Sequence, residues 1–218
     1  MQEVKTFLRQ KNTESAAKHT IPNNSYFYAS EALKCPRQIY YSRKFPQAPD
    51  DKLLGVFYVG ETIHEMFQGI LKEAKADLKD EVEIRIKMDD IEVSGRADLM
   101  GDNEILELKT TADVKYNKDE ASTHHIGQLT LYMSQHRDKK GTLVYIDKRN
   151  LETVEHQIEF DQMTFDAVMN NFKKAKIALD TDKLPLKPGY VDAWQCKYCN
   201  YKDKCDAEMK TRTMDLSE

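Results

Sequence analysis

The amino-acid sequence predicts an α/β domain with a mixed central sheet, followed by a small cysteine-rich element. Three observations lead to this prediction. Apolar residues recur at helical spacing over residues 54–78, strand-like alternation follows over 82–111, and helices and strands then alternate as far as residue 180. This order of elements is typical of helices packed on a mixed sheet. A chain of 218 residues, 40% of them hydrophobic, can bury one core of that kind.

The first third of the chain predicts two helices. Residues 1–24 are polar and weakly patterned, so we expect an arm that can include a short helix. Residues 30–45, SEALKCPRQIYYSRKF, predict a helix with Ser30 as its N-cap, and the loop QAPDD follows. The long helix over 54–78 should bury an apolar stripe formed by Val56, Val59, Ile63, Phe67, Ile70 and Ala74.

The rest of the chain predicts a sheet with two more helices. Strands are expected over residues 82–88, 91–100, 104–111, 142–148 and 153–160, and helices over 124–136 and 162–180. Beyond residue 183, Pro185, Pro188 and Gly189 interrupt regular structure.

Charge and hydropathy limit the classes of partner. The chain contains no secretory signal and no apolar run long enough to cross a membrane, so we expect a soluble, cytoplasmic protein with reduced thiols and no membrane partner. The net charge of −4 argues against a protein that coats nucleic acid through a broad basic surface. It remains compatible with an enzyme that gathers carboxylates around metal ions and confines its basic residues to one groove.

Two carboxylates and one lysine are predicted to meet at a hairpin. On a strand, residues two apart face the same side, so Glu107 and Lys109 project together while Leu106 and Leu108 face the opposite, buried side. Asp98 ends the preceding strand, and a hairpin would bring it opposite Glu107. Such oxygen ligands suit Mg²⁺ or Mn²⁺, which can activate water at a phosphate. The alternative is that these groups are solvated charges on a strand face.

Four cysteines predict a shared metal centre. Cys196 and Cys199 form a C-x2-C pair, Cys205 follows six positions later, and Cys35 lies far upstream. A disulfide is disfavoured in a cytosolic chain, and three unrelated buried cysteines are not expected in a lysine-rich segment. Four thiolates complete either a zinc site or an iron–sulfur cluster, and the spacing alone does not choose between them.

Basic and aromatic residues alternate around Cys35 and recur near the cysteine pair. Cations can neutralise phosphates and rings can stack on unpaired bases, so this pattern predicts binding to a DNA strand. The alternative is a helix with a buried aromatic face and solvated arginines. The predicted DNA-binding residues are Arg37, Tyr40, Tyr41, Arg43, Lys44 and Lys202.

Four short motifs, in this order, resemble the RecB-like branch of the PD-(D/E)xK nucleases. They are G-x3-H at Gly60 and His64, G-R-x-D at Gly95 to Asp98, E-x-K at Glu107 and Lys109, and Q-x3-Y at Gln128 and Tyr132. With a cysteine before this core and C-x2-C-x5-C after it, the chain looks like the CRISPR-associated exonuclease family of RecB-like type. The resemblance spans about residues 26 to 206.

The resemblance implies a fold, a site and a substrate. The fold would be a restriction-endonuclease-like core over residues 25–183, with an arm over 1–24, an iron–sulfur segment over 184–210 and a tail over 211–218. Asp98, Glu107 and His64 would bind Mg²⁺ or Mn²⁺ with the carbonyl of Leu108, and Lys109 would be the catalytic lysine. Gln128 and Tyr132 would support the site and the DNA, and the four cysteines would hold a 4Fe–4S cluster.

Members of this family degrade single-stranded DNA, often from the 5′ end. The resemblance thus implies a 5′ to 3′ exonuclease that acts with CRISPR integration proteins, or in a replication or repair complex, and it admits a homo-oligomer. Two features depart from the pattern: Asn200 stands where proline is common, and residues 1–24 have no counterpart. The competing hypotheses are a non-catalytic DNA-binding scaffold with the same fold and a zinc-ribbon regulator.

Overall fold

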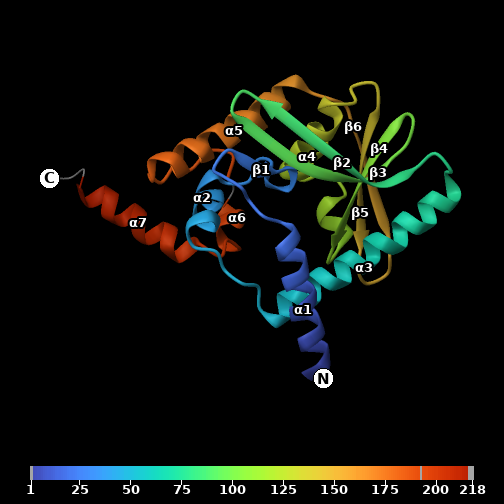
Figure 1. Ribbon diagram of the computed structural model, residues 1–218, viewed down its shortest axis with the longest axis horizontal. Helices are drawn as coiled ribbons and strands as arrows, with labels where there is room; N and C mark the ends of the chain where they lie inside the picture. The colour runs from blue at the N-terminus through green and yellow to red at the C-terminus, as the bar shows by residue number, and fades with distance from the viewer. Residues whose placement is uncertain (1, 192, 216–218) are drawn as a thin grey trace.

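A computed structural model describes residues 2–191 and 193–215, with the side chains of residues 193, 194 and 210–215 left out of the description. Within these residues, six strands form one mixed sheet flanked by helices (Figure 1). The strands are β1 (Tyr26–Tyr28), β2 (Lys79–Met88), β3 (Ile91–Met100), β4 (Glu104–Thr111), β5 (Lys140–Asp147) and β6 (Thr153–Ile158). The helices are α1 (Gln2–Lys18), α2 (Pro36–Lys44), α3 (Asp51–Ala74), α4 (Thr123–Ser134), α5 (Gln162–Thr181), α6 (Ala193–Lys197) and α7 (Lys202–Asp215), and short 3-10 turns lie at Ala29–Glu31 and Val114–Asn117.

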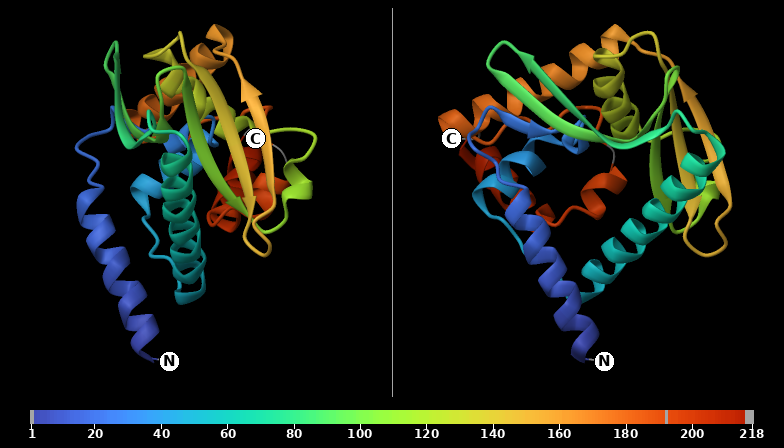
Figure 2. Two further views of the ribbon diagram at one scale, coloured as in Figure 1. Left: turned by 90° about the vertical axis from the view of Figure 1, so that its right-hand side faces the viewer. Right: turned by 45° about the vertical axis from the view of Figure 1, so that its right-hand side comes forward.

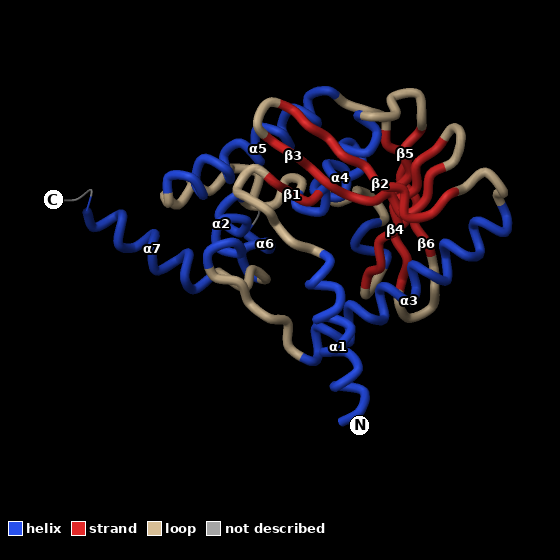
Figure 3. The backbone as a smooth tube through the Cα atoms, in the orientation of Figure 1, coloured by secondary structure: helices blue, strands red, loops and turns tan. Residues whose placement is uncertain are grey.

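The sheet has the order β1-β3-β4-β5-β6, and β2 pairs with the second edge of β3. The β1–β3 and β4–β5 pairs are parallel, while the β2–β3, β3–β4 and β5–β6 pairs are antiparallel. Figure 3 shows that the β2–β3 hairpin runs toward β1, away from the bundle formed by β4, β5 and β6. The predicted mixed α/β sheet with flanking helices is therefore confirmed.

Two apolar layers cover the two faces of the sheet. On one face, α3 packs Ile63 against Leu106 and Leu108 of β4, with Val144 and Ile146 of β5 in the same cluster. The opposite face forms the larger core with α4 and α5. Because neighbouring strand residues point to opposite faces, Glu107 and Lys109 point away from α3, toward α4.

The long helix begins earlier than predicted and buries a different stripe. Asp50 is its N-cap, since its carboxylate accepts a hydrogen bond from the backbone N–H of Leu53. The predicted stripe is wrong in part, because Val56, Val59 and Ile70 are exposed. Ile63 is buried with Phe67 and Leu71 packed beside it, because the sheet lies under the second half of this helix and not under the first.

The segment before α2 also differs from the prediction. Ser30 does not cap a helix that reaches residue 45, because Leu33 adopts a positive φ of 51° and interrupts it. The α-helix begins at Pro36, whose missing N–H costs nothing in the first turn. Cys35 is the residue immediately before this helix.

The N-terminal and C-terminal segments are more helical than predicted. The arm over residues 1–24 contains α1, a helix of 17 residues. The expected tail over 211–218 is helical as far as Asp215, and residues 216–218 lie outside the described residues. A third apolar cluster joins α2, α5 and the turn before α7 through Tyr41, Leu179 and Tyr201. It holds the C-terminal helices against α2, as Figure 1 shows.

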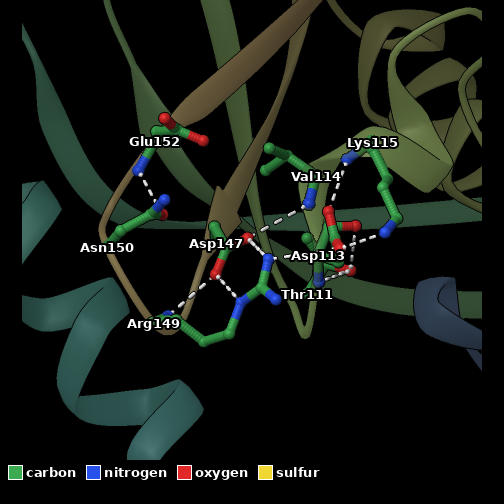
Figure 4. Close-up of polar contacts among 8 residues, drawn as sticks. All are labelled: Thr111, Asp113, Val114, Lys115, Asp147, Arg149, Asn150 and Glu152. Atoms are coloured by element: carbon green, nitrogen blue, oxygen red, sulfur yellow. Dashed lines mark hydrogen bonds and ion pairs between the residues drawn. The ribbon is translucent and has the colours of Figure 1, made fainter.

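A buried carboxylate anchors the loop after β4 to the end of β5 (Figure 4). Asp147 is fully buried, and its Oδ2 accepts hydrogen bonds from Arg149 Nη2 at 2.6 Å and from the Val114 backbone N–H at 3.3 Å. Arg149 also pairs with Asp113 at 3.3 Å. The guanidinium of Arg149 holds the pKa of Asp147 well below its usual range. This network is satisfied within itself and supports the fold. Among the described helices, none is long and apolar enough to span a membrane.

Candidate active site and cysteine cavity

A gap in the pairing of β3 creates the candidate active site. One edge of β3 pairs with β1 through Glu92, Val93 and Ser94, and with β4 through Leu99 and Met100. Between these two stretches, residues 95–98 have no strand partner on that edge among the described residues. We call this stretch the β3 gap. The side chain of Asp98 partly fills it, because Asp98 Oδ2 accepts a hydrogen bond of 2.7 Å from the Leu108 backbone N–H.

Glycine is required in the β3 gap. A Cβ atom on Gly95 would lie 2.7 Å from Ala29 Cβ and 2.8 Å from Tyr132 Cε1, distances that real side chains do not reach. At this position Tyr132 approaches the strand closely. Tyr132 is 1% exposed and comes from α4.

A buried polar network lies beside the gap. Lys109 Nζ donates to Glu107 Oε1 at 2.6 Å and to Gln128 Oε1 at 3.0 Å. Gln128 Nε2 in turn donates to Glu107 Oε1 at 2.7 Å and to the Tyr132 hydroxyl oxygen at 2.9 Å. The predicted E-x-K and Q-x3-Y pairs, 19 or more residues apart in sequence, therefore meet in space.

One carboxylate oxygen of Glu107 has no hydrogen-bond partner among the described residues. Its side chain is 2% exposed, and Glu107 Oε2 accepts no hydrogen bond from the described residues. Burial, reinforced by the negative charge of Asp98, raises the pKa of Glu107 to about 8 despite the nearby Lys109. An orphaned oxygen in such a site costs free energy unless a proton or a cation reaches it. The donor set and the orphaned oxygen fit a hard divalent cation.

His64 approaches the same site from α3. Its Nδ1 lies 3.7 Å from Asp98 Oδ1, and its side chain remains 26% exposed. Leu108, whose carbonyl was the predicted fourth ligand, lies between Glu107 and Lys109 on β4 and binds Asp98 through its N–H. In the present arrangement, however, no three His, Cys, Asp or Glu side chains among the described residues are close enough together to bind one metal ion. Lys109 contacts the Glu107 carboxylate at the position where a bound cation would also lie.

The candidate site opens into a cavity of about 720 Å³. Asp98, Glu107 and Lys109 line it together with residues that the sequence motifs did not single out. Among these additional residues are Lys18, His19, Tyr26, Tyr28, Glu81, Glu83, Arg85 and Ser94. Three of them, Glu81, Glu83 and Arg85, are two residues apart along β2 and therefore lie on one face of the strand. This alternation was the sequence signal that could have identified them. Residues 18–28 carried no pattern from which this position could be deduced.

The four cysteines line one cavity, of about 220 Å³. Cys35 contributes from the start of α2, Cys196 and Cys199 from α6 and the turn after it, and Cys205 from α7. All four are free thiols. Burial raises the pKa of Cys35 and of Cys199, and the other thiols add to this rise. The fold thus brings Cys35 and Cys196, which are 161 positions apart in the chain, to the same cavity.

Cationic side chains adjoin the four thiols. Lys34, Lys187 and Lys202 line it, and Arg37 Nη1 donates to Cys205 Sγ at 3.4 Å. Arg37 is 3% exposed, and its Nε also donates to the Pro185 carbonyl oxygen at 2.7 Å. Neighbouring cations favour thiolates, the form of cysteine that binds metals, and so act against the effect of burial on the thiol pKa.

The residues predicted to bind DNA divide into two groups. Arg37, Tyr40 and Tyr41 are buried, and the Tyr41 ring stacks on Tyr201 with centroids 5.7 Å apart. Arg43 is 14% exposed and makes a two-pronged contact of 2.8 Å with Glu31. These four side chains are committed to interior contacts: the aromatic face is buried, as the alternative had it, but the two arginines are not solvated.

The remaining two are more accessible. Lys44 pairs with Asp182 at 2.7 Å and Lys202 pairs with Asp206 at 2.5 Å, both at the surface. Exposed ion pairs of this kind contribute little and exchange readily, so both ammonium groups are available to a phosphate.

Comparisons with known proteins point to one family. The sequence model of the PD-(D/E)XK nuclease superfamily matches residues 61–206, more than half of the chain. The chain is 25% identical over 215 residues to the CRISPR-associated exonuclease Cas4 of Saccharolobus solfataricus, covering 94% of this chain and 99% of that protein. It is also similar to the crystal structure of SSO0001, with a TM-score of 0.68 and 23% identity, covering 91% of this chain and 94% of that one. The second likeness concerns the fold.

Proposed function

Because the chain belongs to the PD-(D/E)XK nuclease superfamily, we propose that it is a metal-dependent deoxyribonuclease that removes nucleotides from the ends of single-stranded DNA. The observation that carries this proposal is the buried Glu107, whose unpartnered Oε2 stands beside Asp98 and Lys109. The similarity to an exonuclease supports action at strand ends.

In this proposal each residue of the site has one role. His64, Asp98 and Glu107, with the carbonyl oxygen of Leu108, hold a divalent cation. Bound Mg²⁺ or Mn²⁺ would supply a Lewis acid that makes water more acidic and screens the phosphate. Lys109 Nζ, which now donates to Glu107, would turn to the attacking water or to the phosphate oxygens and offset the charge that develops there. Gln128 holds Lys109 and Glu107 in place, and Tyr132 supports Gln128.

The reaction is hydrolysis of a phosphodiester. The water oxygen forms a bond to phosphorus, the bond from phosphorus to the leaving sugar oxygen breaks, and that oxygen gains a proton. We propose that digestion runs 5′ to 3′, in agreement with the family resemblance, and that it serves CRISPR spacer processing or DNA replication and repair.

We further propose that Cys35, Cys196, Cys199 and Cys205 hold a 4Fe–4S cluster. The four thiols line one cavity together with four cationic side chains, which would offset the negative charge of a thiolate-bound cluster. The resemblance to CRISPR-associated exonucleases favours iron–sulfur over zinc. Analysis of iron and zinc, with absorbance in the region of roughly 400 nm expected of thiolate–iron charge transfer, decides between the two.

A non-catalytic DNA-binding scaffold is the competing function. It is favoured by the contact between Lys109 and Glu107. It is also favoured because no three metal-binding side chains lie close together within the described residues. The intact set of Asp98, Glu107 and Lys109 favours the enzyme.

The deciding experiment is digestion of end-labelled DNA with Mn²⁺ or Mg²⁺. Wild type should shorten a labelled single strand, and Glu107→Ala and Lys109→Ala should each lose this activity while keeping the far-ultraviolet circular dichroism spectrum. Equal cleavage by all three proteins would contradict the proposed site. Strand binding without cleavage by the wild type would favour the scaffold.

A further inference from the structure

Helix α1 packs against α3 in a V that opens toward the candidate active site (Figure 2). At the closed end, Arg9 makes hydrogen bonds of 2.7 and 2.9 Å with Asp51, and the Phe7 and Tyr58 rings meet edge to face at 5.5 Å. The helix is otherwise loosely held, because none of its 17 residues, all of them described, is buried. A helix that buries so little contributes little to the fold, so its position calls for another explanation.

A cleft of about 320 Å³ lies between the two helices. It shares Lys18, His19 and Arg96 with the cavity of the candidate active site, so the two spaces adjoin. On α3, the cleft-lining residues Phe57 and Glu61 precede His64 by about two turns and about one turn of the same helix, respectively. The cleft therefore leads along α3 to the side chain that approaches Asp98.

The lining of the cleft combines cations with an exposed ring. Lys11, Lys18 and Arg96 outnumber the carboxylates of Glu14 and Glu61, although the whole chain carries a net charge of −4. Among the described residues, the ammonium group of Lys18 has no ion-pair partner. Cations of this kind neutralise phosphates.

Phe57 supplies the apolar element. Its side chain is 54% exposed and lines the cleft. An exposed phenyl ring beside cations is the arrangement on which an unpaired base stacks. The cleft, of about 320 Å³, is of the size of a small-ligand site.

We propose that the cleft between α1 and α3 is the path by which a single DNA strand reaches the active site. Lys11, Lys18 and Arg96 neutralise its phosphates, and Phe57 stacks on one of its bases. This inference rests on the proposed function and assigns it a strand-binding surface apart from the metal ligands. It also gives residues 1–24, which no motif explains, a role in holding the substrate.

The test compares a cleft pair with a matched surface pair. Lys11→Glu with Lys18→Glu reverses two cleft charges, and Lys118→Glu with Lys174→Glu reverses two exposed lysines elsewhere. Affinity for a fluorescent 20-nucleotide strand is measured by anisotropy with Ca²⁺ in place of Mg²⁺. The cleft pair should weaken binding at least tenfold and lower the salt slope by about 1.4, the value for two phosphate contacts on a single strand. Phe57→Ala should weaken it by about tenfold, and the exposed control Tyr116→Ala should not.

A small substrate separates this inference from the proposed function. Hydrolysis of bis-p-nitrophenyl phosphate with Mn²⁺ needs the metal site alone, so the variants Lys11→Glu and Phe57→Ala, at residues that line the cleft but not the active-site cavity, should retain the wild-type rate. Unchanged strand affinity in the cleft pair, or equal weakening in both lysine pairs, would overturn the path. If the wild type hydrolyses neither the ester nor DNA, the proposed nuclease activity fails, and the anisotropy measurements still decide whether the cleft binds the strand.

Discussion

Asp98 Oδ2 accepts a hydrogen bond of 2.7 Å from the backbone N–H of Leu108, so a side chain bridges β3 and β4 just where their ladder ends. This bond draws the Asp98 carboxylate beside Glu107, which is the neighbour of Leu108 on β4. Two carboxylates are thus held close together at the edge of the core, and burial, together with the repulsion between them, raises the pKa of Glu107.

Glu107→Gln should lower activity far more than stability. The amide keeps the shape of the side chain but leaves the Lys109 ammonium without its carboxylate partner, so the midpoint of thermal unfolding should fall. Activity on single-stranded DNA should fall by at least about 100-fold, because a neutral amide binds a hard cation poorly. Differential scanning calorimetry and the end-labelled assay measure the two effects. A large loss of stability together with full activity would show that Glu107 serves the fold.

Gly95→Ala should destabilise the protein by about 1–3 kcal/mol, because the new methyl group meets Ala29 and Tyr132 at less than 3 Å. Tyr132 bonds to Gln128, so the substitution should also slow cleavage. Chemical denaturation measures the loss. Gly69→Ala is the matched control: in α3, a Cβ at Gly69 finds no described atom within 4 Å, and the gain in helix propensity should stabilise by about 0.5–1 kcal/mol.

Stability should fall on mild acidification through His125. Burial lowers the pKa of His125 to about 2, and its Nδ1 lies 2.9 Å from the Tyr145 hydroxyl. The unfolded chain, with a histidine pKa of about 6.5, then binds the proton more tightly than the folded chain. The contribution is fully present above pH 6.5 and is lost as the pH falls below it, by on the order of 2 kcal/mol at pH 5. His125→Gln should flatten this dependence in unfolding measured at pH 7 and pH 5. An equal slope in both proteins would locate the effect elsewhere.

Arg37→Gln should weaken the retention of the proposed cluster. Arg37 is buried between Pro185 and Cys205 Sγ, and its loss would remove a positive charge beside the thiolates and leave the Pro185 carbonyl without this donor. The visible absorbance of the purified protein should then bleach several times faster in the presence of a chelator. Lys202→Gln is the control, since Lys202 lines the same cavity but pairs with Asp206 at the surface. Equal bleaching in both variants would contradict a specific role for Arg37.

Much of the sheet and of the proposed site follows from local patterns. Strand alternation predicted that Glu107 and Lys109 share a face, and their distance of 2.6 Å confirms it. Helical spacing likewise predicted that Gln128 and Tyr132 share a face, and they are hydrogen-bonded. The order of the four motifs was sufficient to indicate the nuclease superfamily, whose sequence model matches residues 61–206.

The sequence by itself therefore determined which side chains stand together within one strand or one helix, because periods of 2 and 3.6 residues are properties of the backbone. Only the tertiary structure decided which other segments each strand face or helix face contacts. It left Val56 and Val59 of the predicted stripe exposed, buried Arg37 and Tyr41, and brought α1 beside the cavity of the candidate active site. Contacts between distant segments depend on how the strands pair and where the sheet ends, and no local period encodes either.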